Sequence, residues 1–226
     1  MSQVRILPGA PPLYCVVDVE TDGPDPARHS LLSLAAVVCD EAEREIATFA
    51  ATVQPRPGAT RDPDTMAWWE TEPAAWRAAT LDPRPADDVV RELLAFLRAL
   101  PGPRVFVAHP LAFDGAWIDA YLLRYAGLRL FMPHADDPPF HGAGIDLATH
   151  VRALYDLPWT VAPPRYPDLL RDGLPHDHDA LHDARGHMAL FFRSRASARD
   201  PDLRARLRAT MLAADGAADD ARSGAP

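Results

Sequence analysis

The chain has 226 residues, of which 48% are hydrophobic, and its formal net charge is −9 at pH 7. This length predicts one globular domain with a buried core and excludes a pair of ordinary enzyme domains as the simplest organisation. The negative charge argues against a broad basic surface for duplex DNA, although a local acidic site neutralised by divalent ions can still bind a few nucleotides. No apolar run approaches the length of a membrane span, so we expect a cytoplasmic protein.

Residues 1–12 show no periodicity, and we expect them to be a disordered lead-in. The triplet Val4-Arg5-Ile6 can be encoded by GTTCGAATC, which is the T-loop sequence common to tRNA genes. We therefore expect the native protein to begin near Leu13, and mass spectrometry of the native N-terminus would test this expectation.

Three apolar runs follow, at residues 13–18, 31–39 and 45–53, and the first two are separated by a turn rich in Asp, Gly and Pro. This pattern predicts a three-stranded antiparallel meander. Cys15 and Cys39 lie inside the first two runs, so we expect reduced core residues rather than zinc ligands.

The pattern then changes to helices, with one further strand among them. We expect, in chain order, a capped short helix at 64–69, the start of another at 73–77, an amphipathic helix at 87–100, a buried strand at 104–108 and a helix at 115–125.

The last third contains two more helices. Residues 131–144 look irregular, and a helix at 145–157 has Asp146 near its start. A Pro-rich loop that includes Pro163-Pro164 leads to a strong final helix at 180–195. The tail, residues 199–226, reads as a helical piece and then a disordered end. A meander followed by alternating helix, strand and helix predicts an α/β fold with a mixed sheet flanked by helices.

Two carboxylates end the first predicted strand. Asp18 and Glu20 are two residues apart, so their side chains point to the same face of the strand. Like charges held side by side repel unless a cation lies between them. Taken alone, the pair fits either a metal site or a strand that ends in a solvated turn.

A third carboxylate, Asp114, follows the fourth predicted strand where a helix begins. An N-cap is the simplest role for an acidic residue at this position. The crevice outside the strand ends of an open α/β sheet is also where ligands bind, and Asp18 and Glu20 are expected there.

The final helix begins in a run of His and Asp residues from His176 to His187. Such a run fits a solvated helix start or a metal-scavenging cluster. Ala180 and Ala184, however, allow the helix to lie close to the sheet, so that Asp183 faces inward. His178, five residues before Asp183, is then best placed in the loop before the helix, above the same site.

These three segments together resemble the motifs of the DEDDh 3′–5′ exonucleases, the family of the bacterial DNA polymerase III proofreading subunit. The matching segments are Asp18-Val19-Glu20-Thr21, His109 to Asp114, and His178-x-Ala180-x-x-Asp183-Ala184. The resemblance covers residues 13–195 and implies an exonuclease domain at 13–198. It also implies an RNase H-like fold, in which a mixed five-stranded sheet contains an antiparallel meander and then parallel strands.

The resemblance implies a catalytic role for five residues. Asp18 would bridge two divalent ions, Mg²⁺ or Mn²⁺, and Glu20, Asp114 and Asp183 would complete their ligands. His178 would be the general base, and the product would be a nucleoside 5′-monophosphate released from the 3′ end of single-stranded DNA or RNA. Candidate substrate contacts are Thr21, His109 and Phe113.

Two local features depart from or extend this resemblance. The family usually has His-Asn before the second-motif Asp, where this chain has His109-Pro110, and this change affects the expected substrate contacts on that side. The segment 63–69 is similar to one in a subgroup of bacterial 3′–5′ exoribonucleases. Its Trp68 and Trp69 fit either core or lid packing or a base-stacking surface.

Two other functions compete with the exonuclease hypothesis. A metal-dependent phosphohydrolase built on the dyad His182-Asp183, as in HD-domain enzymes, would require an all-helical fold. A non-catalytic exonuclease-like module would bind nucleic acid or a polymerase partner, and the loss of a catalytic residue would favour it, whereas all five are present.

Overall fold

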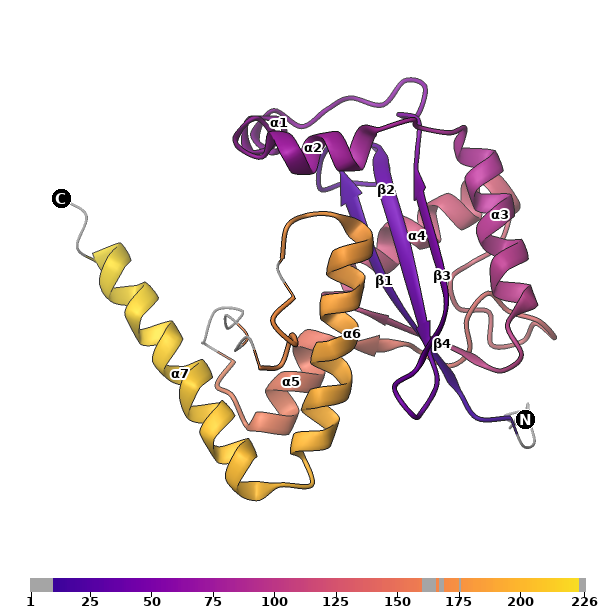
Figure 1. Cartoon of the computed structure of the whole chain (residues 1–226). Helices are drawn as coiled ribbons and strands as arrows, with labels where there is room; N and C mark the ends of the chain where they lie inside the picture. Colours follow the sequence, from indigo (N-terminus) through magenta and orange to yellow (C-terminus); the bar gives the residue numbers. More distant parts are fainter. Residues whose placement is uncertain (1–9, 160–165, 167–168, 175, 224–226) are drawn as a thin grey trace.

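The computed structural model describes residues 10–159, 166, 169–174 and 176–223. These residues build a five-stranded mixed sheet in the order β3-β2-β1-β4-β5, with helices on both faces (Figure 1). Its first three strands form the predicted antiparallel meander, and the last two run parallel to β1. The strands are β1 (Leu13–Thr21), β2 (Leu31–Cys39), β3 (Glu45–Thr52), β4 (Arg104–Ala108) and β5 (Ile145–Asp146).

Alternation along β1 divides the core into two layers. Leu13, Cys15 and Val17 face a cluster that includes α3 (Ala86–Ala99) and α4 (Leu111–Ala126). The intervening residues Tyr14 and Val16 face a second cluster. Helices cover both faces of β1, which explains why this strand is apolar almost throughout.

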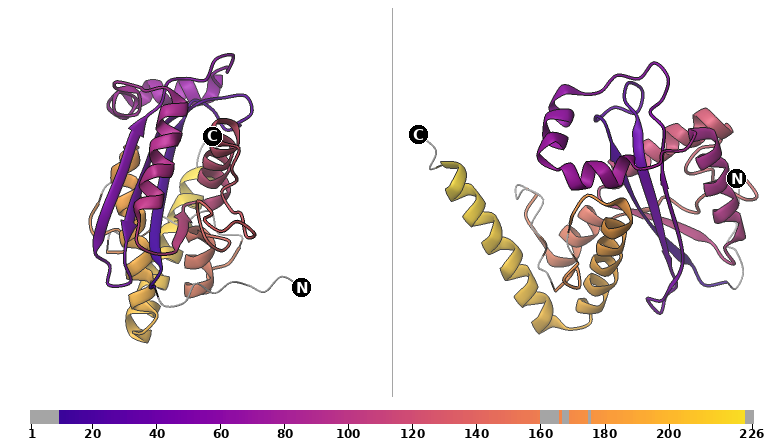
Figure 2. Two further views of the ribbon diagram at one scale, coloured as in Figure 1. Left: turned by 90° about the vertical axis from the view of Figure 1, so that its right-hand side faces the viewer. Right: turned by 45° about the horizontal axis from the view of Figure 1, so that its top comes forward.

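The second layer contains α5 (Leu147–Tyr155) and α6 (Ala180–Ser197), with α7 (Pro201–Ser223) packed against them through Leu207 and Met211. In Figure 1 and in the right-hand view of Figure 2, the far end of α7 stands away from the sheet. The two short helices α1 (Pro63–Thr71) and α2 (Pro73–Thr80) lie across the carboxyl end of β1 (Figure 2).

Side-chain caps explain where several helices begin. The Asp62 carboxylate accepts the Thr65 N–H at the start of α1, and the Asp179 carboxylate accepts the N–H groups of Leu181 and His182 at the start of α6. Each cap satisfies backbone donors that a helix leaves free in its first turn. The capped short helix predicted at 64–69 is confirmed as α1, with Asp62, two residues before the predicted start, as its cap.

Two predicted boundaries near the site are wrong. Helix α4 begins at Leu111 rather than Gly115, because Asp146 accepts the Leu111 N–H (2.9 Å) and Pro110 precedes the helix. Asp114 therefore lies in the first turn and is not the N-cap. Residues 145 and 146 pair with β4 as β5, and Asp146 is the N-cap of α5, so the predicted helix starts two residues later than expected.

Other expectations concern the ends of the chain and its thiols. Helix α7 continues to Ser223, through part of the tail for which we expected disorder. Most of the lead-in, residues 1–9, and the Pro163-Pro164 loop lie outside the described residues. Cys15 and Cys39 are buried free thiols, as expected. None of the helices in the described part of the chain is long and apolar enough to cross a membrane.

A buried hydrogen bond ties α4 to the sheet: the Tyr121 hydroxyl accepts the Leu31 N–H at the start of β2 (2.8 Å). We expect Tyr121→Phe to lower the free energy of unfolding by about 1–3 kcal/mol, because it leaves a buried N–H without a partner. The melting temperature should fall by about 2–4 °C for each kcal/mol of lost unfolding free energy, which thermal unfolding will measure. Tyr125→Phe, one turn further along α4, is the control for loss of a hydroxyl, and equal melting temperatures for the two variants would contradict the prediction.

Candidate active site

The carboxyl end of β1 carries the first two acidic side chains of the site. Asp18 is 7% exposed and the Glu20 side chain 12% exposed, so both are withdrawn from solvent. They lie on the same face of β1 as Tyr14 and Val16, which pack against α6. With Asp183, they offer three ligand oxygens that all lie within 4.8 Å of one another. The predicted common orientation of Asp18 and Glu20 is confirmed.

Asp183 lies in the first turn of α6 and reaches this cluster from the helix. Its side chain is fully buried, and Ala180 and Ala184 on the same helix are buried in the core beside β1 and β2. The two carboxylate oxygens of Asp183 have different partners. Oδ2 accepts the His178 N–H (3.0 Å), whereas Oδ1 lies 2.8 Å from His176 Nδ1 and 3.4 Å from an Arg171 guanidinium nitrogen.

Asp114 reaches the same edge from α4. Its Oδ1 accepts the Val19 N–H (3.2 Å), so the backbone of β1 itself holds this carboxylate beside Asp18 and Glu20. The other oxygen, Oδ2, is buried and has no hydrogen-bond partner. Buried polar atoms are almost always paired, so an unpaired carboxylate oxygen indicates a place prepared for a ligand.

Burial and nearby carboxylates raise the pKa values of Asp18, Glu20 and Asp114. Burial raises the pKa of Asp18 well above its usual range, and Asp114, Glu20 and Asp183 raise it further, opposed by Arg171. Burial raises the pKa of Asp114 to about 8. A divalent cation would offset this effect, and an all-oxygen set of ligands suits Mg²⁺ or Mn²⁺. The residues therefore fit the metal ions that the sequence resemblance implies.

His178 lies in the loop before α6, where the sequence analysis placed it. Its backbone is left-handed, with φ at 58°, and its N–H bond to Asp183 holds this strained conformation in place. The ring nitrogen Nδ1 is 3.8 Å from Glu20 Oε1, and interaction with that carboxylate raises the pKa of His178.

His187 is a site residue to which sequence reasoning gave no role. It follows Asp183 by four residues, so both lie on one face of α6, and its Nδ1 is 3.4 Å from Asp18 Oδ1. The side chain is buried, and burial holds its pKa well below the usual range, so the ring is neutral. The i,i+4 spacing from Asp183 was the signal that could have identified it.

Arg171 is a second addition. It lies in the described stretch 169–174, where no periodicity in the sequence marks it. Gly186 provides the only local signal, because a Cβ at this position would lie 2.7 Å from an Arg171 guanidinium nitrogen. A glycine within a helix indicates close packing of this kind.

A pocket of ≈ 210 Å³ opens beside Glu20 and contains two of the three predicted substrate contacts, Thr21 and Phe113. His109, the third, lies elsewhere: its ring is 5.2 Å from that of His187 and 5.1 Å from that of Tyr166, and burial lowers its pKa to about 4. The full lining of the pocket is Val19, Glu20, Thr21, Gly23, Pro24, Thr65, Trp68, Trp69 and Phe113.

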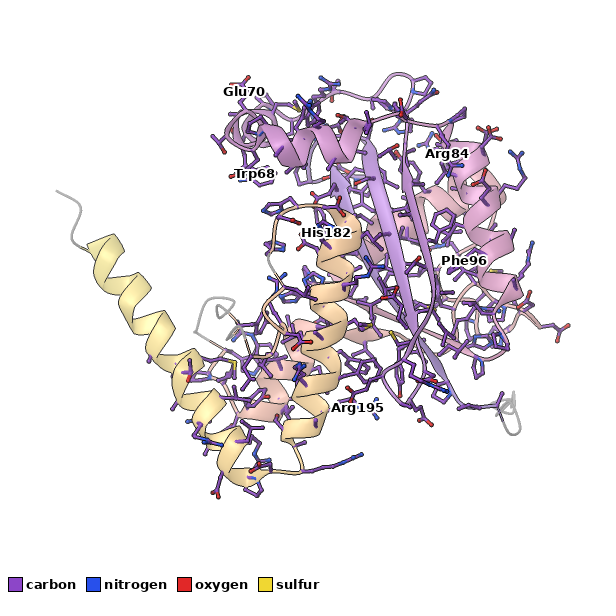
Figure 3. All side chains as sticks on the ribbon, viewed as in Figure 1. Trp68, Glu70, Arg84, Phe96, His182 and Arg195 are labelled. Atoms are coloured by element: carbon purple, nitrogen blue, oxygen red, sulfur yellow. The ribbon has the colours of Figure 1, made fainter. Side chains whose placement is uncertain are left out.

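The two adjacent tryptophans both line this pocket but differ in exposure. Trp69 is 2% exposed, and its indole N–H donates to the Thr21 carbonyl oxygen (2.9 Å), so it packs α1 onto the end of β1. Trp68 is 38% exposed, and its ring centroid is 4.7 Å from that of His178. Figure 3 shows Trp68 on the side of α1 that faces the beginning of α6, where His182 is labelled, whereas Glu70 points away.

The fold and its convergent acidic groups define a class, the exonuclease-type α/β domains. The chain belongs to one family within it, described as the 3′-5′ exoribonuclease Rv2179c-like domain, which matches residues 14–192. A curated relative, the 3′-5′ DNA exonuclease Cap18 of Escherichia coli, is 27% identical over 184 residues, which are 79% of this chain and 89% of the relative. The predicted relationship to the DEDDh-type 3′–5′ exonucleases is confirmed.

Solved structures of exonuclease I share the fold. The zinc-bound E. coli exonuclease I complex with single-stranded DNA has a TM-score of 0.59 at 18% identity, over 86% of this chain and 42% of that one. Exonuclease I of Methylocaldum szegediense has a TM-score of 0.56 at 21% identity, over 85% of this chain and 41% of that one. The chain thus spans less than half the length of these enzymes, and their fold confirms the RNase H-like prediction.

The buried Asp114 carboxyl predicts a pH-dependent stability in the absence of divalent ions. Its folded pKa, about 8, lies above its unfolded value, so its contribution to stability is complete below the unfolded pKa and is lost as pH rises towards 8. Between pH 7 and 8 the loss is at most about 1.4 kcal/mol, or about 3–6 °C in Tm. Asp114→Asn should reduce this slope in thermal unfolding with EDTA, and Mg²⁺ should remove it in the wild type.

Asp87→Asn, at an exposed position on α3, is the control for loss of one negative charge. An unchanged slope in Asp114→Asn, or equal slopes for the two variants, would contradict the assignment of this titration to Asp114.

Proposed function

We propose that this protein is a metal-dependent 3′–5′ exonuclease that hydrolyses phosphodiester bonds of single-stranded nucleic acid and releases nucleoside 5′-monophosphates. The observation that carries the proposal is the convergence of four carboxylates from β1, α4 and α6, with a buried Asp114 oxygen that has no partner. The family match and the relationship to a 3′-5′ DNA exonuclease support it.

Asp18, Glu20 and Asp183 would hold one divalent ion, and Asp18 and Asp114 would contribute to a second, both Mg²⁺ or Mn²⁺. Two such ions about 3.5–4 Å apart supply an activated water and stabilise charge on the attacking and leaving oxygens. The residues contribute rigidity: Val19 N–H fixes Asp114, and His178 N–H fixes Asp183. His187 Nδ1 lies 3.4 Å from Asp18 Oδ1, on the α6 side of the site.

His178 would accept the proton of the attacking water. Its ring lies at the open side of the cluster, 29% exposed, and next to Glu20. Because Glu20 raises the pKa of His178, the neutral form that can accept a proton predominates only above that raised pKa. Activity should therefore rise with pH as His178 loses its proton, which a pH–rate profile will measure.

The 3′-terminal nucleoside would occupy the pocket beside Glu20. Thr65 and Pro24 line the pocket with the aromatic rings of Trp68 and Phe113, and rings of this kind stack on bases with little regard to sequence. The family is described as an exoribonuclease, the relative is named a DNA exonuclease, and exonuclease I is solved with single-stranded DNA. Both RNA and DNA are therefore candidate substrates.

Competing functions lack comparable support. The HD-type phosphohydrolase requires an all-helical fold, whereas β1 to β5 form a sheet, and the His182 ring lies against Asp177 (3.1 Å). A non-catalytic module is not favoured, because all five catalytic candidates are present and meet at one edge of the sheet. A polymerase partner stays a prediction from the resemblance.

Single-stranded RNA and DNA, labelled at the 5′ or 3′ end, will test the reaction with Mg²⁺ or Mn²⁺. We expect shortening from the 3′ end and nucleoside 5′-monophosphate as the product. Asp18→Ala should show no turnover, because it removes the ligand shared by both ions. His178→Ala should lower kcat by about 10²–10⁴-fold, the usual contribution of a general base.

His182→Ala is the matched control, because His182 is an exposed histidine only four residues away, on α6. EDTA should stop the reaction, and an excess of Mg²⁺ should restore it. Equal degradation by the wild type and Asp18→Ala would overturn the mechanism, and loss of label from the 5′ end alone would overturn the polarity.

Trp68 predicts a separate effect on substrate binding. We expect Trp68→Ala to lower kcat/KM by about 5–150-fold, the equivalent of about 1–3 kcal/mol for one stacked base, with Trp68→Phe retaining most of the activity. Trp159→Ala is the matched control, since Trp159 is 75% exposed and does not line the pocket. Steady-state kinetics on a short oligonucleotide will measure the effect, and equal values for both alanine variants would exclude a stacking role.

A further inference from the structure

A second group of metal-ligating atoms overlaps the acidic site but has different chemistry. His176, His178 and Asp183 each offer one ligand atom, and these three atoms lie within 4.8 Å of one another. The set contains two imidazoles and one carboxylate, whereas the group formed by Asp18, Glu20 and Asp183 contains carboxylates alone. Asp183 belongs to both groups.

The ligand types select different ions. Mg²⁺ prefers oxygen ligands in an octahedral arrangement, whereas Zn²⁺ and other late transition metals favour imidazole. Tetrahedral zinc with bonds of about 2.0–2.1 Å separates neighbouring ligand atoms by about 3.3 Å. His176 Nδ1 and Asp183 Oδ1 are 2.8 Å apart, so an ion between them requires a movement of only about half an ångström.

The surrounding chain holds these groups in place while leaving them accessible. The His176 and His178 ring centroids are 4.4 Å apart, and the N–H of His178 is bonded to Asp183. The His176 side chain is 46% exposed, whereas Asp183 is fully buried. An ion can thus enter from solvent at His176 and find its third ligand already fixed on α6.

We propose that His176, His178 and Asp183 form a site for Zn²⁺ or a chemically similar transition-metal ion, and that its occupation inhibits the protein. The inhibitory part rests on the proposed exonuclease function. An ion at this site binds the ring of His178, which then cannot accept a proton. It also binds Asp183, which is then no longer available to the Mg²⁺ or Mn²⁺ site. The two kinds of ion therefore exclude each other at Asp183.

Cobalt binding tests the site without any activity measurement. Co²⁺ bound by imidazole in tetrahedral geometry absorbs strongly in the visible range, so its titration into the wild type should produce that band, and Zn²⁺ should abolish it. We expect His176→Ala to weaken Co²⁺ binding by about tenfold or more, since loss of even an outer-shell partner costs about 10–100-fold. His182→Ala, at the nearby exposed histidine, should bind as the wild type does.

His176→Gln removes the imidazole while keeping a polar side chain, and should behave as His176→Ala does; thermal unfolding will verify that both variants fold. A visible band of equal strength and midpoint in the wild type and both His176 variants would overturn the site. So would the weak absorption of six-coordinate Co²⁺ in the wild type.

Activity with Mg²⁺ and increasing Zn²⁺ tests the inhibition, with each variant compared with its own zinc-free rate. The wild type and His182→Ala should be inhibited at the same zinc concentration, and His176→Ala should need about tenfold more or higher. Equal zinc sensitivity of all three would overturn the inhibitory role. If no substrate is degraded under any condition, the proposed exonuclease function fails, and the cobalt titration still decides the site.

Discussion

Repulsion among buried carboxylates is the constraint on which the rest of this structure depends. Asp18, Glu20, Asp114 and Asp183 meet at one edge of the sheet, where burial and the other three carboxylates all raise the pKa of Asp18. The fold must therefore hold them together by interactions that do not depend on their charges. A strand and two helices packed into both layers of the core supply this rigidity.

Backbone groups orient the acidic side chains. The N–H of Val19 donates to Asp114, and the N–H of His178 donates to Asp183, so a peptide unit next to one functional residue positions another. Such donors move only if the chain moves, which restricts the carboxylates more firmly than a flexible side chain would. His176 and His178 precede α6, and Asp183 and His187 lie in its first two turns, so one short stretch of chain carries four of the site's side chains.

Much of this site follows from local patterns in the sequence. Alternation along β1 places Asp18 and Glu20 on one face, and the small residues Ala180 and Ala184 explain how α6 brings Asp183 inward. The meander and the fourth strand also followed from their apolar runs. These features depend on periodicity within one element, which a sequence displays directly.

The remaining features depend on contacts between distant segments. Helix α4 begins four residues early because Asp146, 35 positions away, accepts the Leu111 N–H, and β5 is too short to produce a pattern. Arg171 and His109 occupy their places through packing against α6 and its neighbours. Trp68 and Trp69 have identical side chains and both line the pocket, and only the position of α1 over β1 buries Trp69 and leaves Trp68 partly exposed.

The Asp146 carboxylate has a consequence for how the site tolerates change. Its Oδ1 accepts the Leu111 N–H at the start of α4, and its Oδ2 accepts the Thr149 N–H at the start of α5. One side chain therefore accepts backbone N–H groups at the start of two helices and fixes where each begins. The first of these helices, α4, carries Asp114. A displacement of about 1 Å at a reacting group can reduce a rate about 100-fold. Asp146 thus influences the position of Asp114, although it is not itself part of the acidic cluster.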